Sequence, residues 1–171
     1  MDYQNYIRTI DDWPNPGVSF KDITPLLADA VVFKSAIDEM CAPFLDSGIT
    51  KIVGAEARGF FFAAAMAYAL DAGFVPARKP GKLPYKTITE SYILEYGENE
   101  LEIHEDALNA QDRVLIVDDV LATGGTADAK SRLVSRCGAE LIGYSFFIEL
   151  SFLEGRKKLN PQLPCSVILT L

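Results

Sequence analysis

The residues with the clearest chemical potential lie together in the stretch VDDVLATGGT, residues 117–126. Two adjacent carboxylates, Asp118 and Asp119, come before a turn of small and hydroxyl-bearing residues. The glycines let backbone approach a ligand closely, and the unpaired N–H groups of a following helix start would suit a phosphate. Because carboxylates repel phosphate, we expect the acid pair to face ribose hydroxyls or a ligand-bound Mg²⁺. The stretch therefore predicts a site that holds a sugar phosphate by both ends.

This segment resembles the phosphoribosyl pyrophosphate loop of the type I phosphoribosyltransferases, which join a nitrogen base to ribose 5-phosphate and release pyrophosphate. An ordinary helix N-cap after a strand is the alternative, but the hydrophobic run, the acid pair and the glycine turn occur here together. The resemblance implies Mg²⁺ as cofactor, carried by the substrate without a direct protein ligand and reaching the acid pair through water. It also implies phosphoribosyl pyrophosphate binding by Asp118, Asp119, Ala122, Thr123, Gly124, Gly125 and Thr126.

Ala122 indicates a branch of this family. Where the 6-oxopurine branch usually has an aspartate that faces the base, alanine can neither transfer a proton nor accept a hydrogen bond. The alanine form resembles the adenine branch, which implies adenine and phosphoribosyl pyrophosphate as substrates and AMP and pyrophosphate as products in purine salvage. The alternatives are a phosphoribosyltransferase for xanthine, orotate or uracil, a non-catalytic sensor of phosphoribosyl pyrophosphate, and another sugar-phosphate binder of similar fold.

The segment PGVSFKDI, residues 16–23, resembles the adenine branch's hood, where backbone groups read the base. The resemblance implies that Ser19 offers its carbonyl to the amino group, that Lys21 offers its N–H to a ring nitrogen, and that Phe20 stacks on the base. Leu150 would cover the opposite face. Many relatives carry Val and Arg where Ser19 and Lys21 stand, a change that backbone recognition tolerates. A Pro-Gly surface loop and a plain core leucine are the alternatives.

Two further segments resemble the pyrophosphate side of such a site. In GAEARGF, residues 54–60, Arg58 would lie at a helix N-terminus and bind the leaving pyrophosphate through its planar guanidinium. The resemblance also implies a cis peptide between Glu56 and Ala57. In ARKPGKLP, residues 77–84, Arg78 and Lys82 would reach the pyrophosphate. The family's equivalent of Arg78 can come from the neighbouring subunit, which implies a homodimer. Solvated basic side chains are the alternative.

The segment SYILEYG, residues 91–97, resembles the far end of the family's mobile lid. The resemblance implies that Glu95 is the catalytic acid or base, alongside Arg58 as the second catalytic residue. Tyr96 would be its partner in the lid. The alternative is a strand edge with a solvent-facing glutamate.

These residues must be positioned by alternating strands and helices. Apolar runs predict strands at residues 52–55, 74–77, 114–117, 141–150 and 166–171, and alternation predicts a hairpin over residues 91–96 and 100–104. Apolar spacing predicts helices over residues 2–10, 29–46, from Gly59 and after Thr126. The pattern is typical of an α/β fold with a central, mostly parallel sheet flanked by helices. The resemblance implies that the chain is a single domain, residues 1–171. Within it, a hood would span about residues 1–28 and a flexible lid about residues 79–105.

Composition excludes several other classes. The 171 residues carry a net charge of −8, which repels nucleic-acid backbones, so no nucleic-acid partner is expected. The longest apolar stretch, residues 59–70, is shorter than the roughly 20 residues that span a bilayer, and no signal peptide is visible, so no membrane partner is expected. Three cysteines that are far apart favour a reducing cytoplasm.

Overall fold

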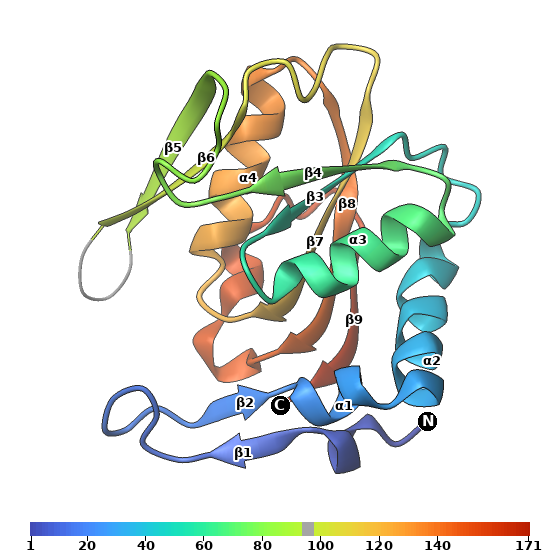
Figure 1. Ribbon diagram of the computed structural model, residues 1–171, viewed down its shortest axis with the longest axis vertical. Coiled ribbons are helices and arrows are strands. Elements are labelled where there is room, and N and C mark those ends of the chain that lie inside the picture. The colour runs from blue at the N-terminus through green and yellow to red at the C-terminus, as the bar shows by residue number, and fades with distance from the viewer. Residues whose placement is uncertain (94–97) are drawn as a thin grey trace.

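The protein is built around a parallel sheet, which Figure 1 shows in a computed structural model that describes residues 1–93 and 98–171. The sheet has the strand order β4-β3-β7-β8-β9, and each neighbouring pair in it runs parallel. The predicted α/β fold with a mostly parallel central sheet is therefore confirmed. The five strands are β3 (Lys51–Ala55), β4 (Gly73–Ala77), β7 (Arg113–Leu121), β8 (Glu140–Glu149) and β9 (Cys165–Thr170).

Helices cover both faces of this sheet. On one face lie α2 (Ala30–Cys41) and α3 (Gly59–Ala69), and on the other lies α4 (Gly125–Arg136). Alternate residues of the central strand β7 serve the two faces, because successive side chains of a strand point to opposite sides. Leu115 packs in the cluster with α2 and α3, whereas Ile116 packs in the cluster with α4. Burial on both faces explains the continuous apolar run in the sequence of this strand.

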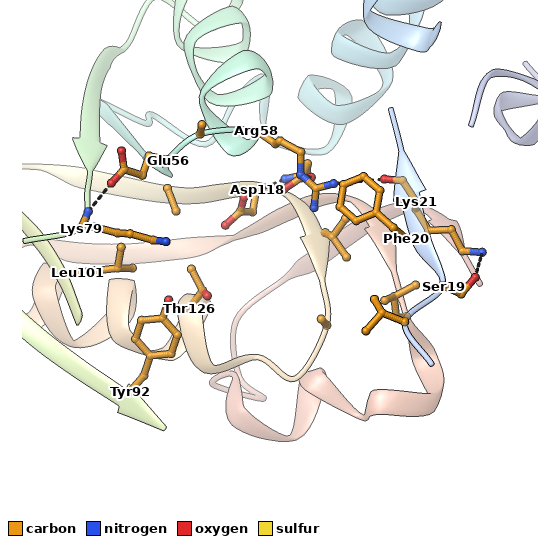
Figure 2. A pocket seen from close by; sticks show the side chains of 17 residues that line it. Ser19, Phe20, Lys21, Glu56, Arg58, Lys79, Tyr92, Leu101, Asp118 and Thr126 are labelled. Atoms are coloured by element: carbon orange, nitrogen blue, oxygen red, sulfur yellow. Dashed lines mark hydrogen bonds and ion pairs between the residues drawn. The ribbon is translucent and has the colours of Figure 1, made fainter. Parts of the chain in front are cut away.

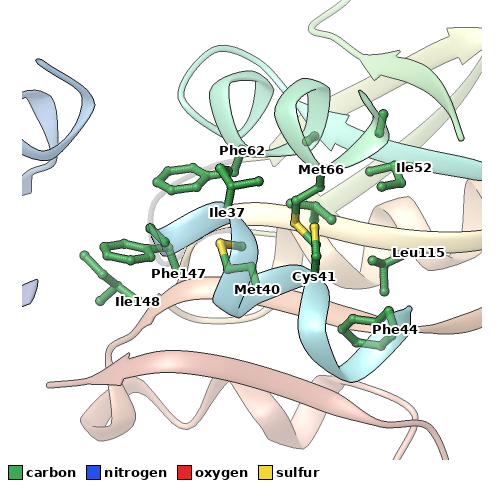
Figure 3. Packing of buried hydrophobic residues seen from close by; sticks show 14 of the residues in the cluster. Ile37, Met40, Cys41, Phe44, Ile52, Phe62, Met66, Leu115, Phe147 and Ile148 are labelled. Atoms are coloured by element: carbon green, nitrogen blue, oxygen red, sulfur yellow. The ribbon is translucent and has the colours of Figure 1, made fainter. Parts of the chain in front are cut away.

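The larger apolar cluster joins α2 and α3 to the sheet, and Figure 3 shows Ile37 and Met40 of α2 beside Phe62 of α3 and Phe147 of β8. The rings of Phe62 and Phe147 stack with centroids 5.2 Å apart. The helix predicted over residues 29–46 begins after Asp29, whose carboxylate caps it. It changes at Cys41 into a 3-10 turn, η2 (Ala42–Phe44). Pro43 has no N–H to continue the α-helical pattern, which explains why the α-helix ends earlier than predicted.

The N-terminal segment differs from the prediction of a helix over residues 2–10. A 3-10 helix, η1 (Tyr3–Tyr6), gives way to strand β1 (Arg8–Ile10), which pairs antiparallel with β2 (Phe20–Asp22). The partner strand lies ten residues further along the chain, so local spacing alone could not show the pairing. The short helix α1 (Thr24–Ala28) follows, and Figure 1 places this ribbon beside the C-terminus of the chain.

A second small sheet is the predicted hairpin. Strand β5 (Thr87–Ile93) pairs antiparallel with β6 (Glu98–His104). Glu90 of β5 anchors the hairpin to α4, where it accepts hydrogen bonds from Arg132 Nε at 2.8 Å and Arg136 Nη1 at 2.9 Å. After β8 the chain forms two 3-10 turns, η3 (Ser151–Leu153) and η4 (Gly155–Lys158). None of the helices in the described ranges is long and apolar enough to cross a membrane.

Candidate active site

A cleft of ≈ 340 Å³ lies at the carboxyl ends of the central strands. Figure 2 shows it running from Ser19, Phe20 and Lys21 at one end to Lys79 and Tyr92 at the other. Segments far apart in the sequence thus meet at the carboxyl ends of parallel strands, where open α/β sheets usually bind their ligands. The predicted site residues that line this cleft are Ser19, Phe20, Lys21, Arg58, Asp118, Asp119, Ala122, Thr126 and Leu150.

The acid pair lies inside a strand and not after it. The predicted strand ended at Val117, but β7 continues through Leu121 because its neighbour β8 continues to pair with it. Consecutive residues of a strand point to opposite faces, so Asp118 and Asp119 have different surroundings although both line the cleft. Asp118 meets Lys130 of α4, whereas Asp119 meets Arg58 before α3.

The carboxylate of Asp118 is held by its own protein on both oxygens. Its Oδ2 lies 2.7 Å from Nζ of Lys130, which is fully buried and also donates to the carbonyl of Val117 at 3.0 Å. Its Oδ1 accepts the N–H of Asp119 at 3.0 Å. A side chain at Gly59 would collide with this carboxylate, so glycine there lets α3 begin directly against it.

Asp119 is buried but less completely satisfied. Arg58 Nε lies 2.8 Å from Asp119 Oδ2, yet the N–H is not aligned with the oxygen, and this oxygen accepts no hydrogen bond from the described residues. Burial raises the pKa of Asp119 to about 7, the negative charge of Asp118 adds to this effect, and the charge of Arg58 only partly offsets it. The site therefore holds one carboxyl group that can change its protonation near neutral pH.

The raised pKa of Asp119 predicts a pH-dependent stability. Because the folded protein keeps the Asp119 proton up to about pH 7 and an unfolded aspartate loses it near the ordinary 3.8, the folded state binds more protons between these values. The stabilisation from this group is complete below the unfolded pKa and is lost as the pH rises through the folded one. Urea unfolding of wild type and Asp119→Asn should show the wild type losing stability relative to the variant between about pH 4 and about pH 8. A pH-independent difference would contradict the shift.

Arg58 connects the acid pair to the hood segment. Its guanidinium carbon lies 4.6 Å from the centroid of the Phe20 ring, and its Nη1 donates to the carbonyl of Lys21 at 3.3 Å (Figure 2). The carbonyl of Lys21 thus faces the cleft and not β1. In an antiparallel pair the N–H and C=O of one residue point to the same side, so the N–H of Lys21 also faces the cleft. This is the direction that base recognition by the Lys21 backbone requires.

The structure does not bring Arg78 and Lys82 into the cleft. Arg78 is bound to Glu56 through Nε at 3.0 Å and Nη2 at 2.8 Å, and its Nη1 donates to the carbonyl of Lys82 at 3.1 Å. Lys79 lines the cleft instead, and its N–H donates to the other oxygen of Glu56 at 2.6 Å. The cause is long-range, because the backbone of Arg78 pairs with Glu102 of β6 and so orients this segment.

Glu56 is a site residue that the sequence interpretation did not assign. Burial acts to raise the pKa of Glu56, but the hydrogen bonds from Lys79 and Arg78 outweigh burial and leave that pKa below its ordinary value. The peptide between Glu56 and Ala57 is cis, as the resemblance implied. The other lining residues missed in the sequence include Lys79, Tyr92 and Leu101. Lys79 had a signal, since it lies in the same basic stretch as Arg78.

The predicted phosphate loop forms an adjoining hollow of ≈ 130 Å³, lined by residues 120–127 with Asp118 and Phe146. Gly124, at φ +80°, is left-handed and lies at the N-cap of α4, a conformation that favours glycine. The loop is supported from behind by Gly155 of η4. A Cβ on Gly155 would collide with the carbonyl of Ala122 and lie 3.0 Å from the backbone nitrogen of Gly124.

Gly155→Ala is expected to weaken phosphoribosyl pyrophosphate binding by about tenfold or more, since a loop displaced by about 1 Å can cost that much. The obstacle is backbone, so no flexible side chain can give way. Isothermal calorimetry with phosphoribosyl pyrophosphate and Mg²⁺ measures the change. Gly73→Ala is the matched control, because the nearest atoms to a Cβ on Gly73 would all belong to the flexible side chain of Lys51, which can give way. Wild-type affinity in the Gly155 variant would show that the contact does not shape the loop.

Glu95 and Tyr96, the predicted catalytic acid or base and its partner in the lid, lie outside the described residues. Their hairpin nevertheless reaches the cleft, because Tyr92 of β5 and Leu101 of β6 line it. Among the described residues, no three His, Cys, Asp or Glu side chains come together as a metal-binding group.

The fold and this cleft define a class of protein, and comparison of the chain with known proteins identifies it. The sequence pattern described as the phosphoribosyl transferase domain matches residues 29–163, so the chain belongs to that family. An adenine phosphoribosyltransferase of Anaeromyxobacter sp. (strain Fw109-5) is 61% identical over 154 residues, which are 90% of this chain and 87% of the relative.

Solved structures agree with this assignment. The adenine phosphoribosyltransferase of Rhodothermus marinus DSM 4252 has a TM-score of 0.95 at 52% identity and covers 98% of this chain and 96% of its own. That of Saccharomyces cerevisiae, complexed with an imino-altritol bisphosphate and adenine, has a TM-score of 0.88 at 39% identity, with 97% and 94% covered. Within its family the chain groups with the adenine phosphoribosyltransferases, which are pentosyltransferases.

Proposed function

We propose that the protein transfers the phosphoribosyl group of 5-phosphoribosyl 1-pyrophosphate to adenine and releases AMP and pyrophosphate, a step of purine salvage. The observation that carries this proposal is a cleft that joins the hood strand to the acid pair and to Ala122 and Thr126, which lie on either side of the glycine turn. A base site and a sugar-phosphate site must adjoin for the two substrates to react. Ala122, which lines the cleft without a polar side chain, favours adenine over 6-oxopurines.

In the proposed reaction the bond from ribose C1 to pyrophosphate breaks, a ring nitrogen of adenine bonds to C1, and that nitrogen loses its proton. Arg58 stabilises the negative charge that develops on the leaving group. Asp118 and Asp119 accept hydrogen bonds from the ribose hydroxyls, and the turn from Thr123 to Thr126 anchors the 5-phosphate, so that remote binding energy positions C1. Glu95 takes the adenine proton when the lid closes.

The base lies against the hood, residues 1–28 in this proposal. The Lys21 N–H faces the cleft and can donate to a ring nitrogen, while the Ser19 carbonyl accepts from the exocyclic amino group. Phe20 and Leu150 line the same cleft and offer apolar surface to the two faces of a purine. Arg58 covers the Phe20 ring at 4.6 Å in this structure, so adenine stacking on that face requires the arginine to swing toward the pyrophosphate.

The residues present fit Mg²⁺ that arrives with the substrate. Asp119 lines the cleft, and its buried Oδ2 accepts no hydrogen bond from the described residues, so this unused acceptor would suit a metal-bound water. Bound Mg²⁺ supplies positive charge at the pyrophosphate oxygens. Asp118 and Asp119 would orient that water and the ribose hydroxyls, while Arg58 binds the oxygens on the opposite side.

An activity screen tests the proposal. The protein is incubated with phosphoribosyl pyrophosphate, Mg²⁺ and one base at a time, and the mononucleotide is separated by chromatography. AMP should form with adenine, and hypoxanthine, guanine, xanthine, orotate and uracil should give little product. A different preferred base would replace the adenine assignment. Binding of phosphoribosyl pyrophosphate without any product would instead support a sensor.

We further propose a homodimer that associates through α3. The helix sequence GFFFAAAMAYA contains no charged residue, so it is apolar on every side, as in helices that are buried all round. Phe62 and Met66 face the core, yet Phe61 is 48% and Tyr68 is 91% exposed. Such an apolar outer face is typical of an interface. Arg78 does not line the cleft of its own chain, which supports the expectation that a partner's site uses it.

Tyr68→Glu is expected to convert the dimer into a folded monomer, because it places a charge on the apolar outer face of α3 without disturbing the core. Sedimentation velocity measures the mass, and circular dichroism confirms the fold. Leu45→Glu is the control, since Leu45 is also well exposed, at 65%, but follows η2. A wild type that is monomeric, or a Tyr68 variant that remains dimeric, contradicts this interface.

The proposed setting is the reducing cytoplasm. The three cysteines, Cys41, Cys137 and Cys165, are all free in the structure, and burial raises the pKa of each thiol. A raised thiol pKa keeps these side chains unreactive, which suits apolar packing and not disulfide chemistry.

A further inference from the structure

Lys130 is the one buried cationic side chain among the described residues, with 0% of its surface exposed. It lies on α4, one turn beyond the phosphate loop, and its side chain reaches the underside of β7. There Nζ lies 2.7 Å from Asp118 Oδ2 and 3.0 Å from the carbonyl of Val117. Lys130 does not line the cleft, so no substrate atom can contact it. A lysine is rarely buried unless its charge is paired, and here the partner is one of the two site carboxylates.

The buried lysine completes a balanced set of charges. Asp118 is paired with Lys130 from behind the strand, and Asp119 is paired with Arg58 from the side of the cleft. Without Lys130, the acid pair above about pH 7, where Asp119 is ionised as well, would carry two negative charges against the single cation Arg58. Phosphoribosyl pyrophosphate is itself a strong anion, so a net negative group beside its ribose would repel it. The balance explains how two carboxylates can stand in a site for a phosphorylated sugar.

We propose that Lys130 is a positioning residue that acts through Asp118, whose negative charge it compensates so that the anionic sugar phosphate can bind beside the acid pair. This inference rests on the proposed function and adds a residue outside the cleft to it. Lys130 also fixes the direction of the Asp118 carboxylate, because it occupies Oδ2 while the Asp119 N–H occupies Oδ1. The charge belongs to the same helix that presents the phosphate loop, so both parts of the sugar site move together.

A purely structural role would give a different pattern, and two variants separate the roles. Lys130→Gln retains N–H donors for Asp118 and Val117 but removes the charge. Lys130→Met retains the apolar stem of the side chain and removes both the N–H donors and the charge. If Lys130 serves only to fasten α4 to β7, the glutamine variant should behave like wild type. If the charge matters, the two variants should be impaired alike in binding the anionic substrate.

The experiment uses the full chain and compares KM for each substrate, kcat, and the calorimetric Kd for phosphoribosyl pyrophosphate with Mg²⁺. In both variants we expect KM and Kd for phosphoribosyl pyrophosphate to rise at least about tenfold, which is a lower bound for one uncompensated charge acting over several ångströms at an effective dielectric constant near 20. KM for the neutral base and kcat at saturating phosphoribosyl pyrophosphate should change by less than about twofold. Lys34→Met, which removes a surface lysine paired with Asp38, is the matched control and should leave all values unchanged.

Several outcomes overturn the inference. One is a folded Lys130→Gln protein with wild-type affinity for phosphoribosyl pyrophosphate, and another is an equal rise of both KM values. If neither variant folds, Lys130 is a structural anchor, and the inference fails as well. Failure of the proposed function is separate, because it would appear as a wild-type protein that makes no AMP.

Discussion

Arg58→Ala is expected to lower kcat by about 10²–10³, the usual cost of removing one preorganised group that stabilises transition-state charge. The pyrophosphate leaves with growing negative charge, and Arg58 is the guanidinium that lines the cleft beside the acid pair. Its side chain is 37% exposed, so the loss of its contacts should change the Tm by only a few degrees. Steady-state AMP formation and calorimetric melting measure the two effects.

Two variants serve as controls for Arg58. Arg58→Lys keeps the charge but loses the planar guanidinium, so its kcat should lie between those of wild type and the alanine variant. Arg8→Ala removes an exposed arginine of β1 that is paired with Asp22 and lies outside the cleft, and it should leave kcat unchanged. An Arg58→Ala enzyme with near-wild-type kcat would remove Arg58 from the catalytic machinery.

Glu95→Ala is expected to lower kcat by about 10²–10⁴, the typical contribution of general acid–base catalysis. Adenine must lose a proton from a ring nitrogen as that nitrogen bonds to ribose C1. The resemblance assigns this proton to Glu95, and the hairpin that carries it reaches the cleft at Tyr92 and Leu101. Because Glu95 is proposed to act on the proton and not on ground-state binding, the Kd for phosphoribosyl pyrophosphate should stay near the wild-type value.

Glu100→Ala is the matched control for Glu95. Glu100 lies on β6 of the same hairpin, paired in register with Ser91, and it is exposed. Removing Glu100 changes the charge of the lid by the same amount as Glu95→Ala does, but it should leave kcat unchanged. If both glutamates affected kcat to the same extent, the effect would come from the charge of the lid and not from proton transfer. If neither did, another group would have to accept the adenine proton.

Local signals in the sequence were sufficient for the elements that carry the site. The apolar run before Asp118 predicted the central strand, because a strand covered on both faces needs apolar residues at every position. Gly124 and Gly125 predicted the turn that opens α4, because glycine lets the backbone approach a ligand closely, and Gly124 is indeed left-handed in the structure. The hairpin was predicted from the alternation of side-chain character along its two strands. The resemblance of short segments then predicted which residues would share one site, but Arg78 and Lys82 do not line the cleft.

The sequence alone thus determined the central strand, the phosphate turn, the hairpin and the family. Tertiary structure alone decided that β1 pairs with β2, that Glu56 draws Arg78 out of the cleft, that Gly155 supports the phosphate loop, and that Lys130 neutralises Asp118. The physical reason is distance along the chain. Periodicity and turn chemistry report on residues within a few positions of each other, whereas these contacts join segments 10 to 33 residues apart, which meet only when the sheet is assembled.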